Sequence, residues 1–497
     1  MDWMDPIFVL FLFALTLAFL WERSHFWNSS SRKLPPGPYP LPLIGNLHLL
    51  DLKRLDRTMF KFSKRYGPVF RIQMGFEKTV VLAGYKTVKE ALVNQADAFA
   101  GRPVVPMIED FEHGNGVVFS NGENWKMMRR FTLTTLRDYG MGKKTIEDKI
   151  VEECHSLIQK FESFEGKPFE TATIMNAAVG NIIVTILLGK RFEYEDQTFI
   201  RLLNLMNENI RLGGQPSVVL YNMFPALGFL SGGRKTMLKN RDELYDFIQA
   251  TFIEHLKELD VNDQRSFIDA FLIQQQEEKN KNQSNRFFHN ENLKALVENL
   301  FGAGMETTST TLRWGLLLMM KYPEIQKKVQ EEITEVIGSA QPRIEHRAKM
   351  PYTDAVIHEV QRFGNILPAG VPHATNADVT LGDYFIPKGT QIIALLYSVL
   401  YDESEWEKPF KFYPEHFLDA EGKFVKRDAF LPFSAGRRVC AGETLAKMEL
   451  FLFFVSLLQR FTFQPAPGTS KEDLDLTPVV GFTALPTAFR ICALPRS

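Results

Sequence analysis

Apolar residues recur at three- and four-residue spacing along most of the chain after residue 46. Clear cases are the segments 145–164, 244–260 and 323–338. Because this spacing places apolar side chains on one face of a helix, each segment predicts an amphipathic helix. Only three short runs, 69–74, 78–84 and 390–397, have the β-branched and apolar character of strands. We therefore predict one large, mainly α domain with a small β portion.

The segment from Gln274 to Arg286, "QQQEEKNKNQSNR", interrupts the helical pattern with a polar tract. Such a tract predicts a surface loop or a frayed helix end. No second linker and no internal repeat is visible after residue 46, so the large domain is expected to span residues 47–497.

The first 46 residues follow a different pattern. Residues 6–21 carry no charge, and the segment 1–22 is expected to form a membrane anchor. Acidic residues precede this run and Arg23 follows it, so the positive-inside rule places the N-terminus outside the cytosol and the rest of the chain in it. A cleaved signal peptide is the alternative, but it favours a basic start and a small-residue cleavage site. Residues 23–46 contain "KLPPGPYPLP", which predicts a stiff linker.

Composition narrows the function classes. The chain has 497 residues, a net charge of −1 and 45% hydrophobic residues, including 42 phenylalanines. The charge gives no indication of a nucleic-acid partner, and the apolar content predicts a large core. The three cysteines, Cys154, Cys440 and Cys492, have no CxxC spacing and cannot form a disulfide framework. A reducing compartment is therefore expected for most of the chain.

Cys440 stands in a glycine-rich loop before an apolar helical run, in "FSAGRRVCAGETLAKMEL". A cysteine thiolate is a strong ligand for iron. Gly436 allows a tight turn, and Gly442 allows a flat ligand to approach the backbone. A helix that begins just after Cys440 would favour the thiolate through its N-terminal dipole. The alternative is a buried, inert cysteine, and this is the interpretation we favour for Cys154 and Cys492.

The spacing Phe433-x-x-Gly436-x-Arg438-x-Cys440-x-Gly442 resembles the haem-binding signature of the cytochrome P-450 monooxygenases. The resemblance implies that Cys440 is the axial thiolate ligand of haem b, iron protoporphyrin IX, and that it donates electron density to the iron. The resemblance runs from the anchor to the C-terminus. It is closest to the vertebrate microsomal enzymes of the second family, which oxidise drugs, fatty acids and steroids.

The segment from Leu300 to Trp314, "LFGAGMETTSTTLRW", falls in a helix predicted to begin near Asn292. Glycines inside a helix each cost about 1 kcal/mol relative to alanine, so Gly302 and Gly304 suggest an opened helix or a close ligand approach. Glu306 and Thr307 offer an acid and an alcohol that could relay protons during dioxygen reduction. The segment resembles the oxygen-activation motif of the family, which implies catalytic roles for both. The alternative is a helix crossing at small residues, with Glu306 on the surface.

Glu359 and Arg362 lie three residues apart and can pair on one helix face. The resemblance implies that they are the buried, structural ExxR pair of the family. His416, in "PEHF", stands where many relatives carry arginine and is expected to join this pair.

Haem carries two propionates that need hydrogen-bond donors. Trp125 and Arg129 are one helical turn apart and could converge on one propionate. The resemblance implies this role for them, and it adds further donors in Arg102, His373 and Arg438. Together with Phe433 and Gly442, these residues form the predicted cofactor-binding set.

The resemblance also predicts which residues contact substrate. They are apolar or small and carry no charge: Val117, Val118, Phe119, Ala303, Gly304, Ile366, Leu367, Val371 and Phe482. A fatty acid, a steroid or a planar xenobiotic would fit such a lining.

The function that the resemblance implies is monooxygenation of apolar small molecules in the endoplasmic reticulum membrane, by a single-pass protein whose catalytic domain faces the cytosol. Electrons would come from NADPH through NADPH–cytochrome P-450 reductase, with cytochrome b5 as a second candidate partner. Five cations are expected to form a basic docking face for an acidic flavoprotein: Lys126, Arg130, Arg137, Arg437 and Lys447.

Two other functions remain open on the sequence. The same fold could isomerise or dehydrate peroxides without dioxygen, although such relatives often lose the acid–alcohol pair. The chain could also be a non-enzymatic, membrane-anchored haem carrier, which would have no need of a proton relay.

Overall fold

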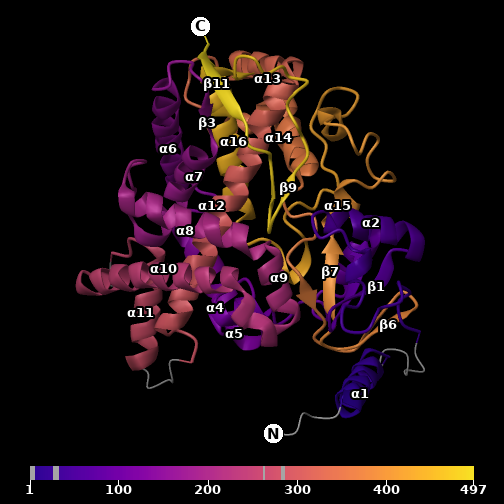
Figure 1. Ribbon diagram of the computed structural model, residues 1–497. Helices are drawn as coiled ribbons and strands as arrows, with labels where there is room; N and C mark the ends of the chain where they lie inside the picture. Colours follow the sequence, from indigo (N-terminus) through magenta and orange to yellow (C-terminus); the bar gives the residue numbers. More distant parts are fainter. Residues whose placement is uncertain (1–5, 26–32, 261–262, 281–285, 497) are drawn as a thin grey trace.

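The computed structural model describes residues 6–25, 33–260, 263–280 and 286–496 (Figure 1). The predicted anchor, 1–22, falls within helix α1 (Pro6–His25), except for residues 1–5, which lie outside the described residues. Across the described residues, no helix combines the length and the apolar character needed to cross a bilayer.

Part of the proline-rich linker packs against the domain. Residues 33–40 form neither helix nor strand, and residues 26–32 lie outside the described part of the chain. The backbone N–H of Arg71 donates to the Pro36 carbonyl oxygen at 2.8 Å. A Cβ atom on Gly37 would lie 2.1 Å from the Arg71 carbonyl oxygen, so only glycine fits here. The C-terminal part of the linker is therefore held against the domain.

Helices form most of the domain, as the hydrophobic pattern predicts. The α-helices after α1 are α2 (Leu55–Tyr66), α3 (Tyr85–Lys89), α4 (Pro106–Glu112), α5 (Gly122–Asp138), α6 (Lys144–Glu162), α7 (Ala172–Leu188), α8 (Gln197–Gly213), α9 (Pro216–Met223), α10 (Gly232–Lys257), α11 (Phe267–Asn280), α12 (Asn290–Lys321), α13 (Pro323–Val336), α14 (Pro351–Gly364), α15 (Leu396–Leu400) and α16 (Glu443–Arg460). Short 3₁₀ or π turns are η2 (Leu47–Leu49), η3 (Glu90–Asn94), η4 (Pro225–Leu230), η5 (Ile344–Lys349), η6 (Pro414–Phe417) and η7 (Gly436–Arg438).

The strands form small sheets. They are β1 (Val69–Met74), β2 (Glu77–Ala83), β3 (Phe169–Glu170), β4 (His373–Ala374), β5 (Val379–Leu381), β6 (Tyr384–Ile386), β7 (Gln391–Leu395), β8 (Phe461–Pro465), β9 (Val479–Val480), β10 (Ala484–Leu485) and β11 (Arg490–Pro495). The largest sheet has the order β1-β2-β7-β4, in which β2 and β7 run parallel from Thr79 opposite Gln391. The others have the orders β3-β11-β8, β5-β6 and β10-β9. The three predicted strands are β1, β2 and β7, which confirms a mainly helical fold with a small β portion.

Helix α12 runs through the middle of the helical part and packs on α7, α14 and α16 (Figure 1). Most of its side chains are buried, and so is nearly all of α7. The polar tract after Gln274 continues α11 to Asn280, and residues 281–285 lie outside the described part of the chain. The loop that carries Cys440 leads directly into α16, so the packing of α12 and α16 places the two main motifs close together.

Candidate functional site

A single cavity brings together most of the predicted site residues. One side of it is the middle of α12, with Ala303, Gly304 and Thr307, and another is the loop before α16, with Cys440 and Gly442. These two segments are more than 130 positions apart in the sequence. Their packing therefore places a thiol and a hydroxyl on the lining of one cavity.

The loop before Cys440 contains one position, residue 436, that only glycine can occupy. Gly436 has φ +77°, and a Cβ atom there would lie 1.7 Å from the Leu92 carbonyl oxygen. The Cys440 N–H donates to the Phe433 carbonyl oxygen at 3.1 Å and closes the loop. A Cβ on Gly442 would meet only the Cys440 Sγ, at 4.0 Å, so glycine leaves the space beside the sulfur open. The structure thus requires glycine at position 436, and the role of Gly442 stays a prediction.

The Cys440 side chain is exposed, but to the cavity rather than to the outer surface. Burial raises the pKa of its thiol, and the N–H groups of Gly442 and Glu443 and the Arg129 guanidinium act in the opposite direction. The helix start therefore points donors at the sulfur, as predicted, but these donors lower the pKa of the thiol by less than burial raises it. A thiolate at this depth needs a cation as partner, which a bound iron supplies. Cys154 and Cys492 are buried, free cysteines.

Three guanidinium groups converge beside Cys440. Burial and the mutual repulsion of these groups lower the pKa of Arg438 to about 8, with Arg102 and Arg129 as the neighbours. The same causes lower the pKa of Arg102 to about 9. Buried like charges are costly unless an anion compensates them, so this cluster fits an anionic ligand.

Two buried donors of this cluster have no hydrogen-bond partner among the described residues. They are Trp125 Nε1 and Arg438 Nη1. The Arg438 guanidinium lies over the Trp125 ring, with 3.8 Å from its central carbon to the ring centroid. Buried polar atoms rarely stay unpaired in proteins. The unpaired donors, the guanidinium cluster and the open sulfur together fit a haem with its two propionates.

Other predicted donors are already used within the protein. Arg102 donates to the carbonyl oxygens of Val118, Val371 and Pro372 at 2.7–3.0 Å, and Arg129 donates to that of Val439 at 2.6 Å. These arginines hold the loops around the cavity and also bring positive charge to it.

His373 is buried in β4, and its Nδ1 lies 2.9 Å from the Phe99 carbonyl oxygen. That contact places the proton on Nδ1. Burial and the neighbouring Arg102 lower the pKa of His373 to about 3. The imidazole is therefore neutral, and its Nε2 would donate to a propionate only if the negative charge of a bound haem's propionates stabilised a second proton on the ring.

Thr307 and Glu306 occupy different environments on α12. Thr307 lines the cavity, and its Oγ1 donates to the Ala303 carbonyl oxygen at 2.7 Å. Glu306 is buried outside the lining of the cavity, where its Oε1 accepts hydrogen bonds from Thr310 at 3.4 Å and Thr483 at 3.0 Å. Burial raises the pKa of its carboxyl. The two residues do not share the hydrogen bond that a direct relay would use.

The glycines of α12 serve close helix packing. A Cβ on Gly302 would lie 2.4 Å from Met206 Cε, and one on Gly304 would lie 2.7 Å from Ile183 Cδ1. The helix-crossing alternative therefore explains both glycines, although Glu306 is buried rather than on the surface. Gly304 also lines the cavity, as predicted.

The predicted ExxR pair is present. Glu359 and Arg362 are fully buried and joined by two hydrogen bonds of 2.7 Å. Arg362 also donates to the carbonyl oxygens of Leu400, Pro409 and Lys411. His416 Nδ1 lies 3.2 Å from Glu359 Oε2, and its Nε2 accepts the N–H of Lys408 at 3.1 Å. All three residues lock the segment after α15 onto α14.

Most predicted substrate contacts line the cavity. They are Val117, Val118, Ala303, Gly304, Ile366, Leu367 and Val371. Phe119 is not among the lining residues, and Phe482 lies on the surface with 49% of its side chain exposed. Phe482 follows β9 at a bend, and residue spacing alone could not show which way that bend turns.

Two functional candidates were missed in the sequence. Glu449 on α16 lines the cavity, is fully buried and has an unpaired Oε1. Burial raises its pKa to about 8, although the Thr308 hydroxyl acts in the opposite direction. In the sequence, Glu449 could have been noticed as a single carboxylate within the apolar run "KMELFLFF". Asn299, eight residues before Thr307 on α12, also lines the cavity.

The five predicted docking cations are partly neutralised. Lys126 pairs with Glu123, Arg437 with Asp97 and Lys447 with Glu443, at 2.6–2.8 Å. Arg130 donates to Met127 Sδ rather than to a carboxylate, and Arg137 is exposed. The unneutralised charge is therefore concentrated on α5.

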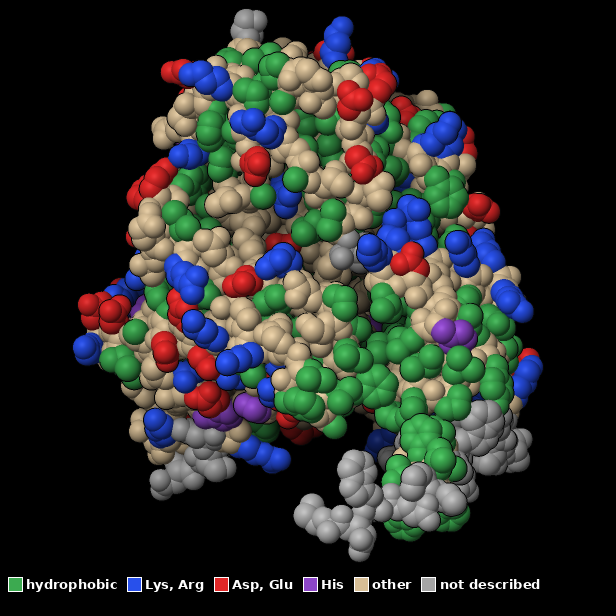
Figure 2. Space-filling model, viewed as in Figure 1, with side chains coloured by type: hydrophobic (Ala, Val, Ile, Leu, Met, Phe, Trp, Pro, Cys, Tyr) green, Lys and Arg blue, Asp and Glu red, His purple; other side chains and the backbone are tan. Residues whose placement is uncertain are grey.

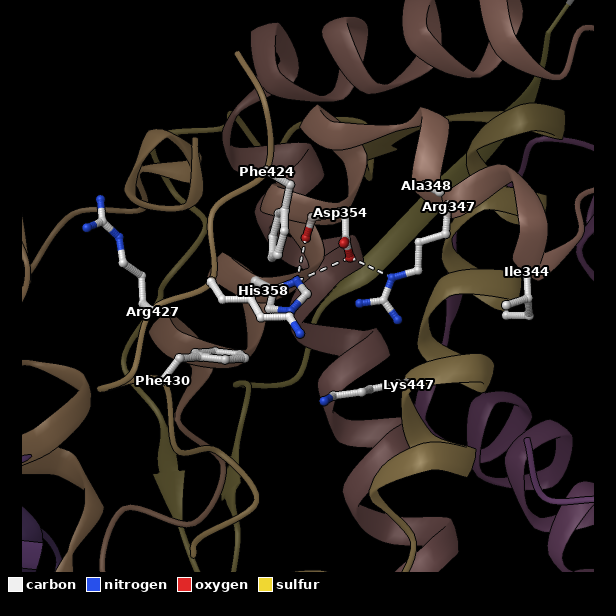
Figure 3. A pocket seen from close by; sticks show the side chains of 10 residues that line it. Ile344, Arg347, Ala348, Asp354, His358, Phe424, Arg427, Phe430 and Lys447 are labelled. Carbon is white, nitrogen blue, oxygen red and sulfur yellow. Dashed lines mark hydrogen bonds and ion pairs between the residues drawn. The ribbon is translucent and has the colours of Figure 1, made fainter. Parts of the chain in front are cut away.

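Lys447 also lines a separate hollow of about 520 Å³ (Figure 3). Figure 3 shows the side chains of Lys447, His358 and Arg347 around this hollow, and Arg347 pairs with Asp354 at 2.8 Å. Lys426 and Arg427 belong to the same lining. The basic region near the Cys440 loop therefore includes cations that the sequence did not single out.

Comparison with known proteins agrees with this geometry. The sequence profile of the cytochrome P-450 family matches residues 35–493. Cytochrome P-450 2K4 of Oncorhynchus mykiss is 54% identical over 93% of this chain and 92% of its own length. Cytochrome P-450 2K6 of Danio rerio is 52% identical over 92% of this chain and 90% of its own length. Cytochrome P-450 2C5 of Oryctolagus cuniculus is 48% identical over 99% of this chain and all of its own length. The chain belongs to the cytochrome P-450 family, and within it to the second family.

Proposed function

We propose that this haem monooxygenase inserts one oxygen atom from dioxygen into apolar small molecules, such as xenobiotics, fatty acids or steroids. The observation that carries the proposal is the cavity itself, in which Cys440 faces Thr307 between apolar walls. Val117, Ile366 and Leu367 contribute apolar surface to it, and its charged residues are gathered near the cysteine loop. An uncharged, apolar molecule is what such walls bind.

A bound haem would supply dioxygen binding and redox chemistry, with Cys440 as its ligand and Trp125 and Arg438 as donors to its propionates. The residues of the chain itself exclude water, hold the substrate and place a hydroxyl. Thr307 brings that hydroxyl to the cavity that Cys440 also lines, where it can hold and pass on a proton. Glu449 lies along the cavity as a second acid besides Glu306.

Electrons would come from NADPH through a flavoprotein reductase, with cytochrome b5 as a further partner. The exposed cations of α5, together with Lys447 and its neighbours, support an acidic partner near the Cys440 loop. No nucleic-acid partner is proposed.

We further propose attachment to the endoplasmic reticulum membrane through α1, with the domain in the cytosol. The side chains from Phe8 to Phe13 on α1 are 43–65% exposed. Figure 2 shows hydrophobic side chains gathered next to α1, over the part of the surface where β1 and α9 lie in Figure 1. The exposed apolar residues of these parts and their neighbours include Leu41, Leu49, Phe76, Leu220 and Phe229. An apolar area of this kind favours contact with lipid. Release of the full chain from microsomes by carbonate washing would contradict this part of the proposal.

The central test is the spectrum of the reduced protein with carbon monoxide. Thiolate-ligated haem gives a red-shifted Soret band, and Cys440→Ser should lose both this band and product formation. Cys154→Ser is the matched control and should keep both. A Cys440→Ser protein that keeps the band and its activity would refute the assignment.

A further inference from the structure

Asn299 on α12 holds the loop that forms one wall of the cavity. Its Oδ1 accepts the backbone N–H groups of Val117 and Val118, both at 3.0 Å. Val117 and Val118 line the cavity. One side-chain oxygen therefore fixes two consecutive residues of the wall.

The residue before Val117 also lies in close contact with α12. Gly116 has φ +77°, and a Cβ atom there would lie 2.5 Å from Asn299 Oδ1. The Gly116 N–H donates to Asn292 Oδ1 at 2.8 Å. Asn292 and Asn299 are seven residues apart, which places them on the same face of α12. The loop from Gly116 to Val118 is thus fastened to α12 at two points.

Glu112 accepts a hydrogen bond from the nitrogen of the Asn299 amide. Asn299 Nδ2 donates to Glu112 Oε1 at 2.8 Å. Because two N–H donors face the oxygen and a carboxyl faces the nitrogen, only one orientation of the amide satisfies all three contacts. Glu112 is the last residue of α4 and only 7% exposed, so its carboxyl is held at this depth.

The acid is costly to bury, which indicates that it has a role. Glu112 Oε2 and the nearby Glu298 Oε2 have no hydrogen-bond partner among the described residues. An apolar residue would avoid this cost but would leave Asn299 Nδ2 without its acceptor. Ala303 and Thr307 follow Asn299 on the same face of α12 by one and two helical turns, and both line the cavity. The contacts of Glu112 and Asn299 therefore lie next to the part of the cavity that holds Thr307.

We propose that Glu112 is a positioning residue which acts through Asn299 to fix the cavity wall at Val117 and Val118 and thereby sets which ligands the cavity accepts. Glu112 is not among the residues that line the cavity, so its effect on a ligand there is indirect and runs through Asn299. The proposal rests on the proposed function only in placing substrate in this cavity.

The test uses the full-length holoenzyme and two haem-binding probes. Imidazole is the smaller probe, whereas 4-phenylimidazole carries an additional ring that we expect to meet the wall at Val117 and Val118. The ratio of their dissociation constants, read from the Soret shift, reports cavity shape separately from haem binding. Neither probe requires turnover or an electron donor, so failure here would leave the monooxygenase proposal intact.

Glu112→Met and Asn299→Ala should each change the ratio of the dissociation constants at least about fivefold, with the imidazole constant nearly unchanged. Glu112→Gln keeps an acceptor for Asn299 Nδ2, so its ratio of dissociation constants should equal that of wild type. Glu109→Met, an exposed position on the same helix, is the matched control and should leave the ratio unchanged.

Hydrogen exchange of the peptide containing Val117 and Val118 supplies a second readout. Asn299→Ala and Glu112→Met should speed exchange of these amides about tenfold or more, because an amide exchanges when its hydrogen bond opens. If Glu112→Met does not fold, Gly116→Ala tests the same contact from the loop side and should give the same changes. A wild-type ratio and wild-type exchange in Asn299→Ala would overturn the proposal. Altered behaviour in Asn299→Ala with wild-type behaviour in Glu112→Met would overturn the role of Glu112.

Discussion

Thr483 donates a hydrogen bond of 3.0 Å from its Oγ1 to Glu306 Oε1, although 177 positions separate the two residues. Trp314 Nε1 makes a parallel contact to the Ala484 carbonyl oxygen at 2.9 Å. These two bonds tie α12 to Thr483 and to the first residue of β10, and the first of them holds the Glu306 carboxyl outside the lining of the cavity. Thr307, the next residue, lines the cavity whereas Glu306 does not, so the hydroxyl and the acid have separate surroundings.

Thr307→Ala should uncouple electron consumption from product formation. The variant should bind haem and substrate almost normally, because neither needs the hydroxyl. Product per NADPH should fall roughly tenfold or more, and hydrogen peroxide per NADPH should rise, since positioned proton transfer contributes strongly to rate. Thr307→Ser keeps the hydroxyl and should retain much of the coupling. Wild-type coupling in Thr307→Ala on a good substrate would show that another group delivers the proton.

Trp125→Phe should release haem faster. The substitution keeps the ring that lies under Arg438 and removes only the unpaired Nε1–H. Loss of one charge-assisted hydrogen bond should speed haem transfer to apomyoglobin about tenfold or more. Trp406→Phe is a control, because its Nε1 donates to the Val399 carbonyl oxygen. The control should lower thermal stability without this selective effect, and equal haem transfer in both variants would argue against a propionate contact.

Reversing the charge of Arg130 and Arg137 together should slow electron transfer from the reductase about tenfold at low salt. The difference should shrink as salt rises, since screening weakens attraction between surfaces. Lys126→Glu should act more weakly, because Lys126 is already paired with Glu123. The double change Lys235→Glu with Lys239→Glu on α10 alters net charge equally and serves as control. An identical salt dependence in both double variants would place the docking surface elsewhere.

Glu112→Gln should stabilise the protein at alkaline pH. Burial and the neighbouring Glu298 raise the pKa of Glu112 to about 8, whereas an unfolded glutamate titrates near about 4.3. The folded state thus holds a proton that the unfolded state has lost, and stability falls as pH rises between these two values. The melting temperature of Glu112→Gln should match that of wild type near pH 5 and exceed it by roughly 1–3 °C at pH 8. Glu77 is exposed and is not among the charges that raise the pKa of Glu112, so Glu77→Gln should show no such pH-dependent gain.

The sequence alone determined the helical character, the three main strands and the motifs around Cys440, Thr307 and Glu359. These features are local: periodicity, glycines in a tight loop and residues one helical turn apart act over a few neighbouring positions. The resemblance to a known family then joined the motifs into one predicted site, and most of its residues line the cavity between α12 and the Cys440 loop.

Only the tertiary structure decided which partner each polar group meets. Glu306 accepts a hydrogen bond from Thr483. The glycines of α12 pack against Met206 and Ile183, and Phe482 is exposed. Glu449 and the pairing of Glu112 with Asn299 could not be read from spacing either. The physical reason is that a buried polar group is stabilised by whichever donor or acceptor the packed chain brings within about 3 Å. Those partners come from distant segments, and their choice depends on how the helices pack rather than on the residues next to them in the sequence.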